Sequence, residues 1–368
     1  MFRLYAIQAR FGDCFLLEYG EAEPAYILLD GGPSKNYENH LKPALQEILK
    51  GGSELEAVIV SHVDNDHILG VLDLFVEKKY QRDTGKQEIF TVNQLWFNSF
   101  KGTIDTSDFE KRIRAINTIA GVNGFRMQEM SMAVNGIQEG HQLLSVARFL
   151  DIPINPGVAE GFYKSGMAEA AFQKSNLKIT IVGPTMDNLE KLRKKWEDWI
   201  ADNEQKIQAG QYTKEFAAMS DRSVPNLSSI VMLVEVDGKT LLLTGDCRGD
   251  HLLQGLEEAG LLKNGKFHTD IIKVPHHGSA RNATKEFFAA ITADTYIISA
   301  DGTYGNPDYE TLTWIVETAK EGNRKIKIIF TNDTDSTKEL LTKYPLADWG
   351  YETRFLEKGK NYLEIITG

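Results

Sequence analysis

Cysteine is scarce in this sequence, and long apolar runs are missing. Only Cys14 and Cys247 occur among 368 residues, which excludes a disulfide framework and leaves at most one bridge open. No segment approaches the roughly 18 apolar residues that a membrane span needs. Arg3, Arg10 and Asp13 interrupt the stretch where a secretory signal would be apolar. We therefore expect a cytoplasmic protein with no membrane partner.

Net positive charge is also absent. The 41 lysine and arginine residues are outnumbered by 52 aspartate and glutamate residues, which gives a formal net charge of −11. This sign disfavours broad, non-specific binding of a phosphate backbone, although it does not exclude local patches. Bound metal would neutralise some of the acids, so the overall sign says little about a single pocket.

Apolar runs and turn signals divide the chain into two strand-rich blocks around a middle segment. Residues 1–76 alternate short apolar runs with turns, and the same alternation returns over 226–368. The segment between them, about 77–225, is mostly helical in pattern, with strands indicated at LKITIV and QLWFN. We expect a single α/β domain in which the two blocks form the core and the middle is a mainly helical insertion or cap.

The strongest chemical signal is the segment SHVDNDH, which directly follows an apolar strand. It offers four ligand-type side chains, which are His62, Asp64, Asp66 and His67. Sites in α/β folds form at the C-terminal ends of strands, and so many imidazoles and carboxylates repel or desolvate badly unless a cation joins them. The alternative is a solvated loop in which Asp66 caps the next helix. This pattern would arise by accident in a chain of this size on the order of once in a thousand.

Two further segments repeat this placement after apolar strands. Asp246 ends one of them, although a lone aspartate there would more often be a helix cap or turn residue. The segment VPHHGS brings two adjacent histidines. Neighbouring side chains of an extended backbone point in opposite directions, so we expect His276 to bind metal and His277 to transfer a proton or contact phosphate. A surface turn is the alternative for this segment.

Together these motifs resemble the metallo-β-lactamase superfamily, and in particular the hydrolase domain of ComEC-type DNA-uptake proteins. The segments that carry the resemblance are, in order, FGDCFLLEYG, ILLDGG, SHVDNDH, NLSSIVMLVE with KTLLLTGDC, IIKVPHHGSA and ISADGTYGNPD. The resemblance implies an αβ/βα four-layer sandwich with metal at the edge where two sheets end. It also implies hydrolysis of phosphodiester or other ester-like bonds.

The resemblance assigns roles to individual residues. The first two ligand residues of SHVDNDH match one metal position, the last two match a second, and the aspartate of the later GDC segment matches a bridging acid. With the histidine favoured above, the expected ligands are His62, Asp64, Asp66, His67, Asp246 and His276. Asp30 matches an acid that orients a ligand histidine. The site would hold two divalent ions, with Zn first and Mn or Fe as alternatives.

Two positions depart from the superfamily pattern. Asp64 stands where most members have His, a change that the ComEC-type branch shares, and Asn306 stands where a late His ligand is usual. Both changes make the site richer in oxygen, so Mn or Fe competes with Zn. His141, the only histidine between SHVDNDH and Asp246, is a further open ligand. The chain also lacks the membrane channel of the uptake proteins, so the resemblance does not make it a DNA importer.

The hypothesis for mechanism is hydrolysis by a hydroxide held between two metal ions about 3.5 to 4 Å apart. Asp66 would orient the nucleophile or accept its proton, while His277, Ser279 and Asn306 would contact the scissile group. A phosphodiester in a nucleotide or nucleic acid is preferred as substrate by family analogy. The alternatives are hydrolysis of small esters or lactams, and a non-catalytic or partner-binding module with a degenerate metal site.

Overall fold

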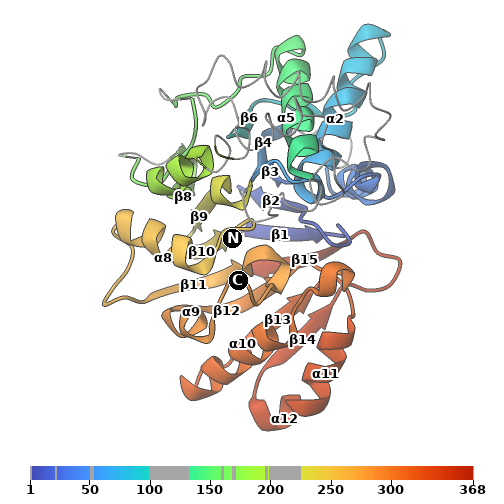
Figure 1. Ribbon diagram of the computed structural model, residues 1–368. Helices are drawn as coiled ribbons and strands as arrows, with labels where there is room; N and C mark the ends of the chain where they lie inside the picture. The colour runs from blue at the N-terminus through green and yellow to red at the C-terminus, as the bar shows by residue number, and fades with distance from the viewer. Residues whose placement is uncertain are drawn as a thin grey trace, which may run out of the picture.

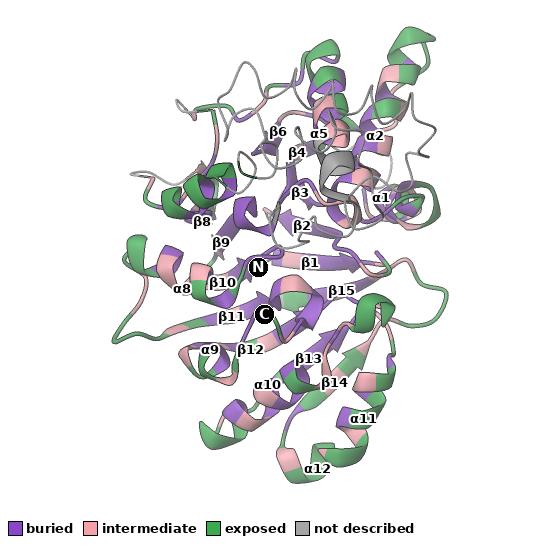
Figure 2. Ribbon diagram, viewed as in Figure 1, coloured by how far each residue is buried: buried purple, intermediate pink, exposed green. Residues whose placement is uncertain are grey.

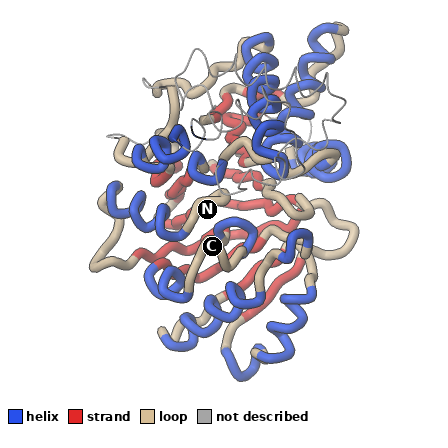
Figure 3. Tube along the Cα trace, in the orientation of Figure 1, coloured by secondary structure: helices blue, strands red, loops and turns tan. Residues whose placement is uncertain are grey.

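Two β-sheets pack face to face, and helices cover their outer faces (Figure 1). Figure 3 shows the strands in the interior of the molecule with the helices around them. In this computed structural model the described residues are 2–20, 23–49, 54–98, 132–158, 161–167, 171–194, 198 and 225–367.

The first sheet combines strands from the start of the chain with one from its end. Its strands are β1 (Phe2–Ile7), β2 (Phe15–Tyr19), β3 (Ala25–Leu29), β4 (Glu54–Val60), β5 (Thr91–Val92), β6 (Leu95–Phe97) and β15 (Tyr362–Thr367). The order is β15-β1-β2-β3-β4-β5, and β6 also pairs with β4. The pairs from β15 to β3 are antiparallel, whereas β4 runs parallel to β3.

The second sheet is built mainly from the C-terminal half. Its strands are β7 (Phe172–Lys174), β8 (Leu177–Gly183), β9 (Val231–Val236), β10 (Lys239–Leu243), β11 (Phe267–Lys273), β12 (Ile291–Ile298), β13 (Lys327–Phe330) and β14 (Glu352–Phe355). They follow one another in sequence order across the sheet. From β10 to β14 all pairs are parallel.

Three hydrophobic cores define the four layers. The central core lies between the sheets, and the two outer cores lie between each sheet and its helices. Strand β2 illustrates the cause, because Phe15 and Leu17 enter the central core while Leu16 enters the outer one. Both faces of the strand are covered, which explains why it reads as a continuous apolar run. Figure 2 accordingly shows buried strands inside and exposed outer helix faces.

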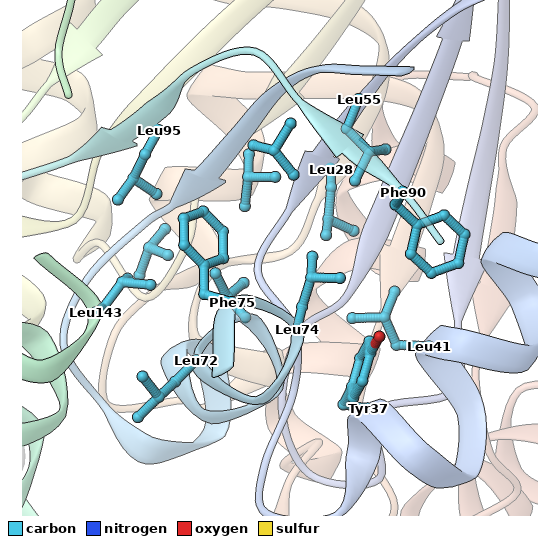
Figure 4. Close-up of a cluster of buried hydrophobic side chains, with 14 of the residues drawn as sticks. Leu28, Tyr37, Leu41, Leu55, Leu72, Leu74, Phe75, Phe90, Leu95 and Leu143 are labelled. Atoms are coloured by element: carbon cyan, nitrogen blue, oxygen red, sulfur yellow. The ribbon is translucent and has the colours of Figure 1, made fainter. Parts of the chain in front are cut away.

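Each outer core has its own set of helices. The first sheet is covered by the π-helix η1 (Tyr37–Leu41), α1 (Lys42–Ile48), α2 (Asn65–Asp83) and α5 (Met132–Phe149). Figure 4 shows part of this core, where Leu72 and Phe75 of α2 and Leu143 of α5 face Leu95 of β6. The second sheet is covered by α8 (Gly249–Glu258), α9 (Lys285–Ala290), α10 (Tyr309–Glu321), α11 (Asp335–Lys343) and α12 (Leu346–Trp349).

The segment 77–225 contributes to both sheets. Strands β6 and β8 lie where the sequence indicated strands at QLWFN and LKITIV, and each pairs with a core strand. Helix α5 packs against α2. The middle of the chain is therefore attached along both sheets in its described parts. Of the described helices, none combines the length and apolar character required to cross a bilayer.

The ends of four strands meet at one edge of the sandwich. Strands β3 and β4 are parallel in one sheet, and β10 and β11 are parallel in the other, so each pair ends on the same side. The two sheets are joined at this edge, where Ile230 N donates to Ser61 O at 2.9 Å. Residues that follow these strands are thus brought together from distant parts of the sequence.

Candidate metal centre

Two glycines let helix α2 approach the end of β3 closely. A side chain at Gly31 would place its Cβ 2.3 Å from Val71 N, and one at Gly70 would place its Cβ 1.9 Å from Gly31 O. Only glycine fits such a contact. Because Gly31 N also donates to His67 O at 2.8 Å, the first turn of α2 is held beside Asp30. The GG of ILLDGG therefore positions the residues of SHVDNDH.

The aspartates at the start of α2 do not act as helix caps. Asp64 occupies the N-cap position, but its side chain makes no capping hydrogen bond. Asp66 lies in the first turn, with its side chain about one-fifth exposed (22%). Their carboxylates thus remain available for another partner, which disfavours the alternative of a simple capped loop.

Three buried histidines present an unbonded nitrogen to the same region. His62 Nδ1 lies 3.0 Å from Ser61 Oγ, His67 Nδ1 lies 2.8 Å from Asp30 Oδ2, and His277 Nδ1 donates to Ser299 O at 3.0 Å. In each ring the Nε2 atom is buried and has no hydrogen-bond partner within the described residues. With the proton held on Nδ1, each Nε2 offers a lone pair, which is the arrangement of a metal-binding histidine.

The Asp246 carboxylate lies at the centre of these nitrogens. Its Oδ2 lies 3.3 Å from His277 Nε2, and its Oδ1 lies 3.4 Å from His67 Nε2. One ligand atom from each of four residues, Asp66, His67, Asp246 and His277, lies within 4.8 Å of the others. A divalent cation at their centre could bind all four.

His62 and Asp64 form a second group of side chains beside Asp246. His62 Nε2 is 3.5 Å from Asp64 Oδ2 and 4.0 Å from Asp246 Oδ2. Asp246 is thus shared by both groups of side chains, which is the place of a bridging acid. The five metal-ligating residues expected from SHVDNDH and Asp246 therefore converge.

The two adjacent histidines do not alternate as an extended backbone would require. Both have left-handed conformations, with φ 47° at His276 and 55° at His277, so both side chains reach Asp246. They differ in their partners. Asn226 Nδ2 lies 3.1 Å from His276 Nδ1, so this nitrogen accepts and the neutral ring carries its proton on Nε2, 3.8 Å from Asp246 Oδ2. At the Nε2 atom, therefore, His277 has a lone pair and His276 has a proton.

Two buried residues of the site were missed by the sequence reasoning. Lys273, the last residue of β11, forms ion pairs with Asp13 and with Asp246 Oδ1. Asp13 Oδ1 also lies 3.4 Å from His277 Nδ1. The available signals were a lysine inside the apolar run IIKV and the GDC triplet at 12–14, which repeats the one around Asp246.

Electrostatics in this cluster hold the acids ionised. Burial opposes the charge of Asp13, but Lys273 and His277 lower the pKa of Asp13 to about 2. Burial likewise opposes the charge of Lys273, but Asp13 and Asp246 raise the pKa of Lys273 above its usual value. The carboxylates also raise the pKa of His277 well above its ordinary value against the effect of burial. A cation that binds there would displace protons from such imidazoles.

The charges of the site suit divalent cations. Five carboxylates converge on it, from Asp13, Asp30, Asp64, Asp66 and Asp246. Lys273 offsets one of these charges, which leaves four negative charges when the histidines are neutral. Together with the three unbonded Nε2 atoms, this donor set fits divalent metal ions.

The remaining expected residues, Ser279, Asn306 and His141, lie on segments that adjoin the cluster. Ser279 is buried and its N donates to His276 O at 2.9 Å, and Asn306 is partly exposed in the loop before α10. His141 lies on α5, beside Gly140, which packs near Val63. Their involvement stays a prediction.

An aromatic pair borders the site. Phe11 and Tyr304 form an edge-to-face contact at 5.5 Å, and the Arg10 guanidinium lies 5.2 Å from the Phe11 ring centre. The loop of Phe11 reaches the site, because Asp13 N donates to Asp66 O at 3.2 Å. Tyr304 is 57% exposed. The loop of Tyr304 is joined to the segment of the two adjacent histidines, since Asp308 N donates to Gly278 O at 3.0 Å.

Residues 7–117 match the Metallo-beta-lactamase superfamily. The matched segment includes Asp30 and all of SHVDNDH, and with the four layers described above it gives the chain a metallo-β-lactamase fold, as expected. No match was found among curated proteins. The comparisons also give no specific link to ComEC-type proteins, so that part of the expectation stays a resemblance.

Solved structures with similarity to the chain include three at low identity. A diphosphatase from the PhnP family is 11% identical with a TM-score of 0.40, covering 100% of this chain and 98% of its own. Zn²⁺-bound PqqB from Methylobacterium extorquens is 10% identical with a TM-score of 0.40, covering 100% of both chains. A protein of unknown function from Enterococcus faecalis V583 is 12% identical with a TM-score of 0.29, covering 97% of this chain and 88% of its own.

Proposed function

We propose that this protein is a metal-dependent phosphodiesterase or nuclease with two divalent cations. His62, Asp64 and Asp246 would hold the first, and Asp66, His67, Asp246 and His277 the second. The observation that carries the proposal is the convergence of three buried, unbonded imidazole nitrogens on one carboxylate. Such intact donors favour a metal site over a degenerate, non-catalytic module.

The roles of the two adjacent histidines are reversed relative to the sequence-based assignment. His277 is the proposed ligand because its Nδ1 donates to Ser299 O and its Nε2 is unbonded. His276 is 23% exposed and carries its proton on Nε2, so it would donate a hydrogen bond from Nε2 to an oxygen of the reacting phosphate.

Bound cations would supply Lewis-acid activation of the phosphoryl group and of the attacking water near neutral pH. The protein contributes the rest of the chemistry. Asp66 would orient the nucleophile, as its carboxylate is the more exposed of those in the four-residue group. Asp30 and Ser61 would fix the rings of His67 and His62.

The substrate we propose is a phosphodiester of a nucleotide or nucleic acid. Support comes from Arg10, Phe11 and Tyr304 at the border of the site. A guanidinium binds phosphate oxygens, and an exposed aromatic ring stacks on a base. The acidic composition favours small or single-stranded substrates over broad binding of duplex DNA.

The test combines metal analysis with a substrate screen. We expect about one to two equivalents of Zn, Mn or Fe per chain and hydrolysis of nucleotides or oligonucleotides after reconstitution. Asp66→Ala with Asp246→Ala should abolish that turnover. Full turnover in this double variant would contradict the mechanism. Less than about half an equivalent of metal, with no activity after reconstitution, would favour the non-catalytic module. Activity confined to lactams or small carboxylic esters would show that the substrate is not a phosphodiester.

A further inference from the structure

A lysine is buried in the middle of the acidic site. Lys273 is 1% exposed, and its Nζ donates to Gly245 O at 2.8 Å. The same Nζ contacts Asp13 and lies 3.4 Å from Asp246 Oδ1. These three partners match the three hydrogens of an ammonium group, so its direction is fixed. A buried charge is tolerated only with such complete pairing.

The two oxygens of Asp246 consequently face different surroundings. Oδ2 faces imidazole nitrogens of both proposed cation positions, at 4.0 Å from His62 Nε2 and 3.3 Å from His277 Nε2. Oδ1 faces Lys273 and lies 3.4 Å from His67 Nε2. A carboxylate between two cations can give one oxygen to each or share a single oxygen. The Lys273 ammonium competes with a cation for Oδ1, the oxygen that the first arrangement would need.

We infer that Lys273 is a positioning residue that holds Asp246 Oδ1 and leaves Oδ2 as the single oxygen shared by both cations. This inference rests on the proposed function, because it concerns how that site holds its ions. Asp13 supports this arrangement, because it pairs with Lys273 and so helps to fix the direction of the ammonium group. A shared oxygen keeps the two cations closer together than a two-oxygen bridge does.

The competing explanation is that Lys273 and Asp13 form a structural ion pair only. The pair links β11 of one sheet to the turn between β1 and β2 of the other. A structural role would change thermal stability without changing how the two ions interact. The test must therefore measure the interaction between the two bound ions and not stability alone.

The experiment loads the full chain with Mn²⁺ and compares variants by metal content, electron paramagnetic resonance and crystal structure. In the wild-type protein we expect two Mn²⁺ with exchange coupling, both on Asp246 Oδ2, and Oδ1 bonded to Lys273. In Lys273→Met the freed Oδ1 should take one ion, so exchange coupling weakens or is lost while both ions remain bound. The double variant Asp13→Asn with Lys273→Met removes both charges of the pair. It replaces Lys273→Met in the same measurements if the single variant fails to fold.

The matched control is Lys239→Met, which removes an exposed lysine that pairs with Asp270 on the same sheet. It should leave the coupling unchanged. Ions divided between the two Asp246 oxygens in the wild type, or unaltered coupling in both Lys273 variants, would overturn this inference and leave the proposed function intact. Absence of any bound Mn²⁺, Zn²⁺ or Fe²⁺ in the wild type would overturn both.

Discussion

The Asp30 carboxylate holds two consecutive parts of the site through separate oxygens. Its Oδ2 lies 2.8 Å from His67 Nδ1 and accepts from Ser61 Oγ at 2.7 Å, while Oδ1 accepts from Ser61 N at 2.7 Å. Ser61 Oγ in turn lies 3.0 Å from His62 Nδ1. One buried acid therefore orients histidines of both proposed cation positions.

Replacing this acid should weaken metal binding without removing a ligand. Asp30→Asn keeps the size of the side chain but removes the charge that keeps the His67 proton on Nδ1. We expect the affinity for Zn²⁺ or Mn²⁺ to fall about 10- to 100-fold, as for other partners of ligand histidines. Isothermal titration calorimetry measures it. Asp270→Asn, whose carboxylate accepts from Thr240 and Lys239, is the control. An equal loss in both variants would contradict the orienting role.

The two adjacent histidines should respond differently to removal. His277→Ala takes away an unbonded Nε2 at 3.3 Å from Asp246, so bound metal should drop and turnover should fall by at least about 100-fold. His276→Ala should retain the metal but lose turnover, because the hydrogen bond from Nε2 to the reacting phosphate is lost. Metal content with single-turnover rates separates the cases. Loss of metal in His276→Ala with retention in His277→Ala would restore the assignment made from the sequence.

The residues at the border of the site should affect substrate binding more than chemistry. Tyr304→Ala should raise KM for a dinucleotide about tenfold, since loss of one base stack costs about 1 to 3 kcal/mol. Arg10→Ala should raise it by a similar factor through a lost contact to phosphate. Tyr304→Ala should leave kcat/KM unchanged for methyl p-nitrophenyl phosphate, which has no base, whereas Arg10→Ala should lower it, because this substrate keeps the phosphate. Tyr80→Ala removes an equally exposed tyrosine on α2 and should have no effect on KM. Equal effects of Tyr304→Ala on both substrates would argue against base recognition.

Helix α5 carries an acid whose titration should appear in the stability of the protein. Burial raises the pKa of Glu139 to about 7. Its Oε2 has no hydrogen-bond partner in the part of the chain that the structure describes. Between its ordinary value of 4.5 and this value the folded state binds more protons than the unfolded state, so stability falls as pH rises and levels off above about 7. Melting curves of Glu139→Gln should lack this component. Identical pH profiles for both proteins would refute the prediction.

Much of the site could be predicted because its residues directly follow apolar strands. His62 to His67 come after β4 and Asp246 after β10, so strand ends alone place them at one edge. The orientation of the adjacent histidines could not be predicted, since it depends on two left-handed residues that no local pattern requires. Lys273 resembled an ordinary strand residue, and Asp13 an ordinary turn residue. Only their pairing across the two sheets reveals what they contact.

The pairing of β1 with β15 has a consequence for synthesis of the protein. Phe2 to Ile7 pair along their whole length with Tyr362 to Thr367, at the opposite end of the sequence. A growing chain therefore carries β1 with one open side until β15 has left the ribosome. Unpaired strand edges recruit strands from other molecules. Shortening the chain before Tyr362 should therefore favour aggregation during expression, even though every side chain of the metal cluster would still be present.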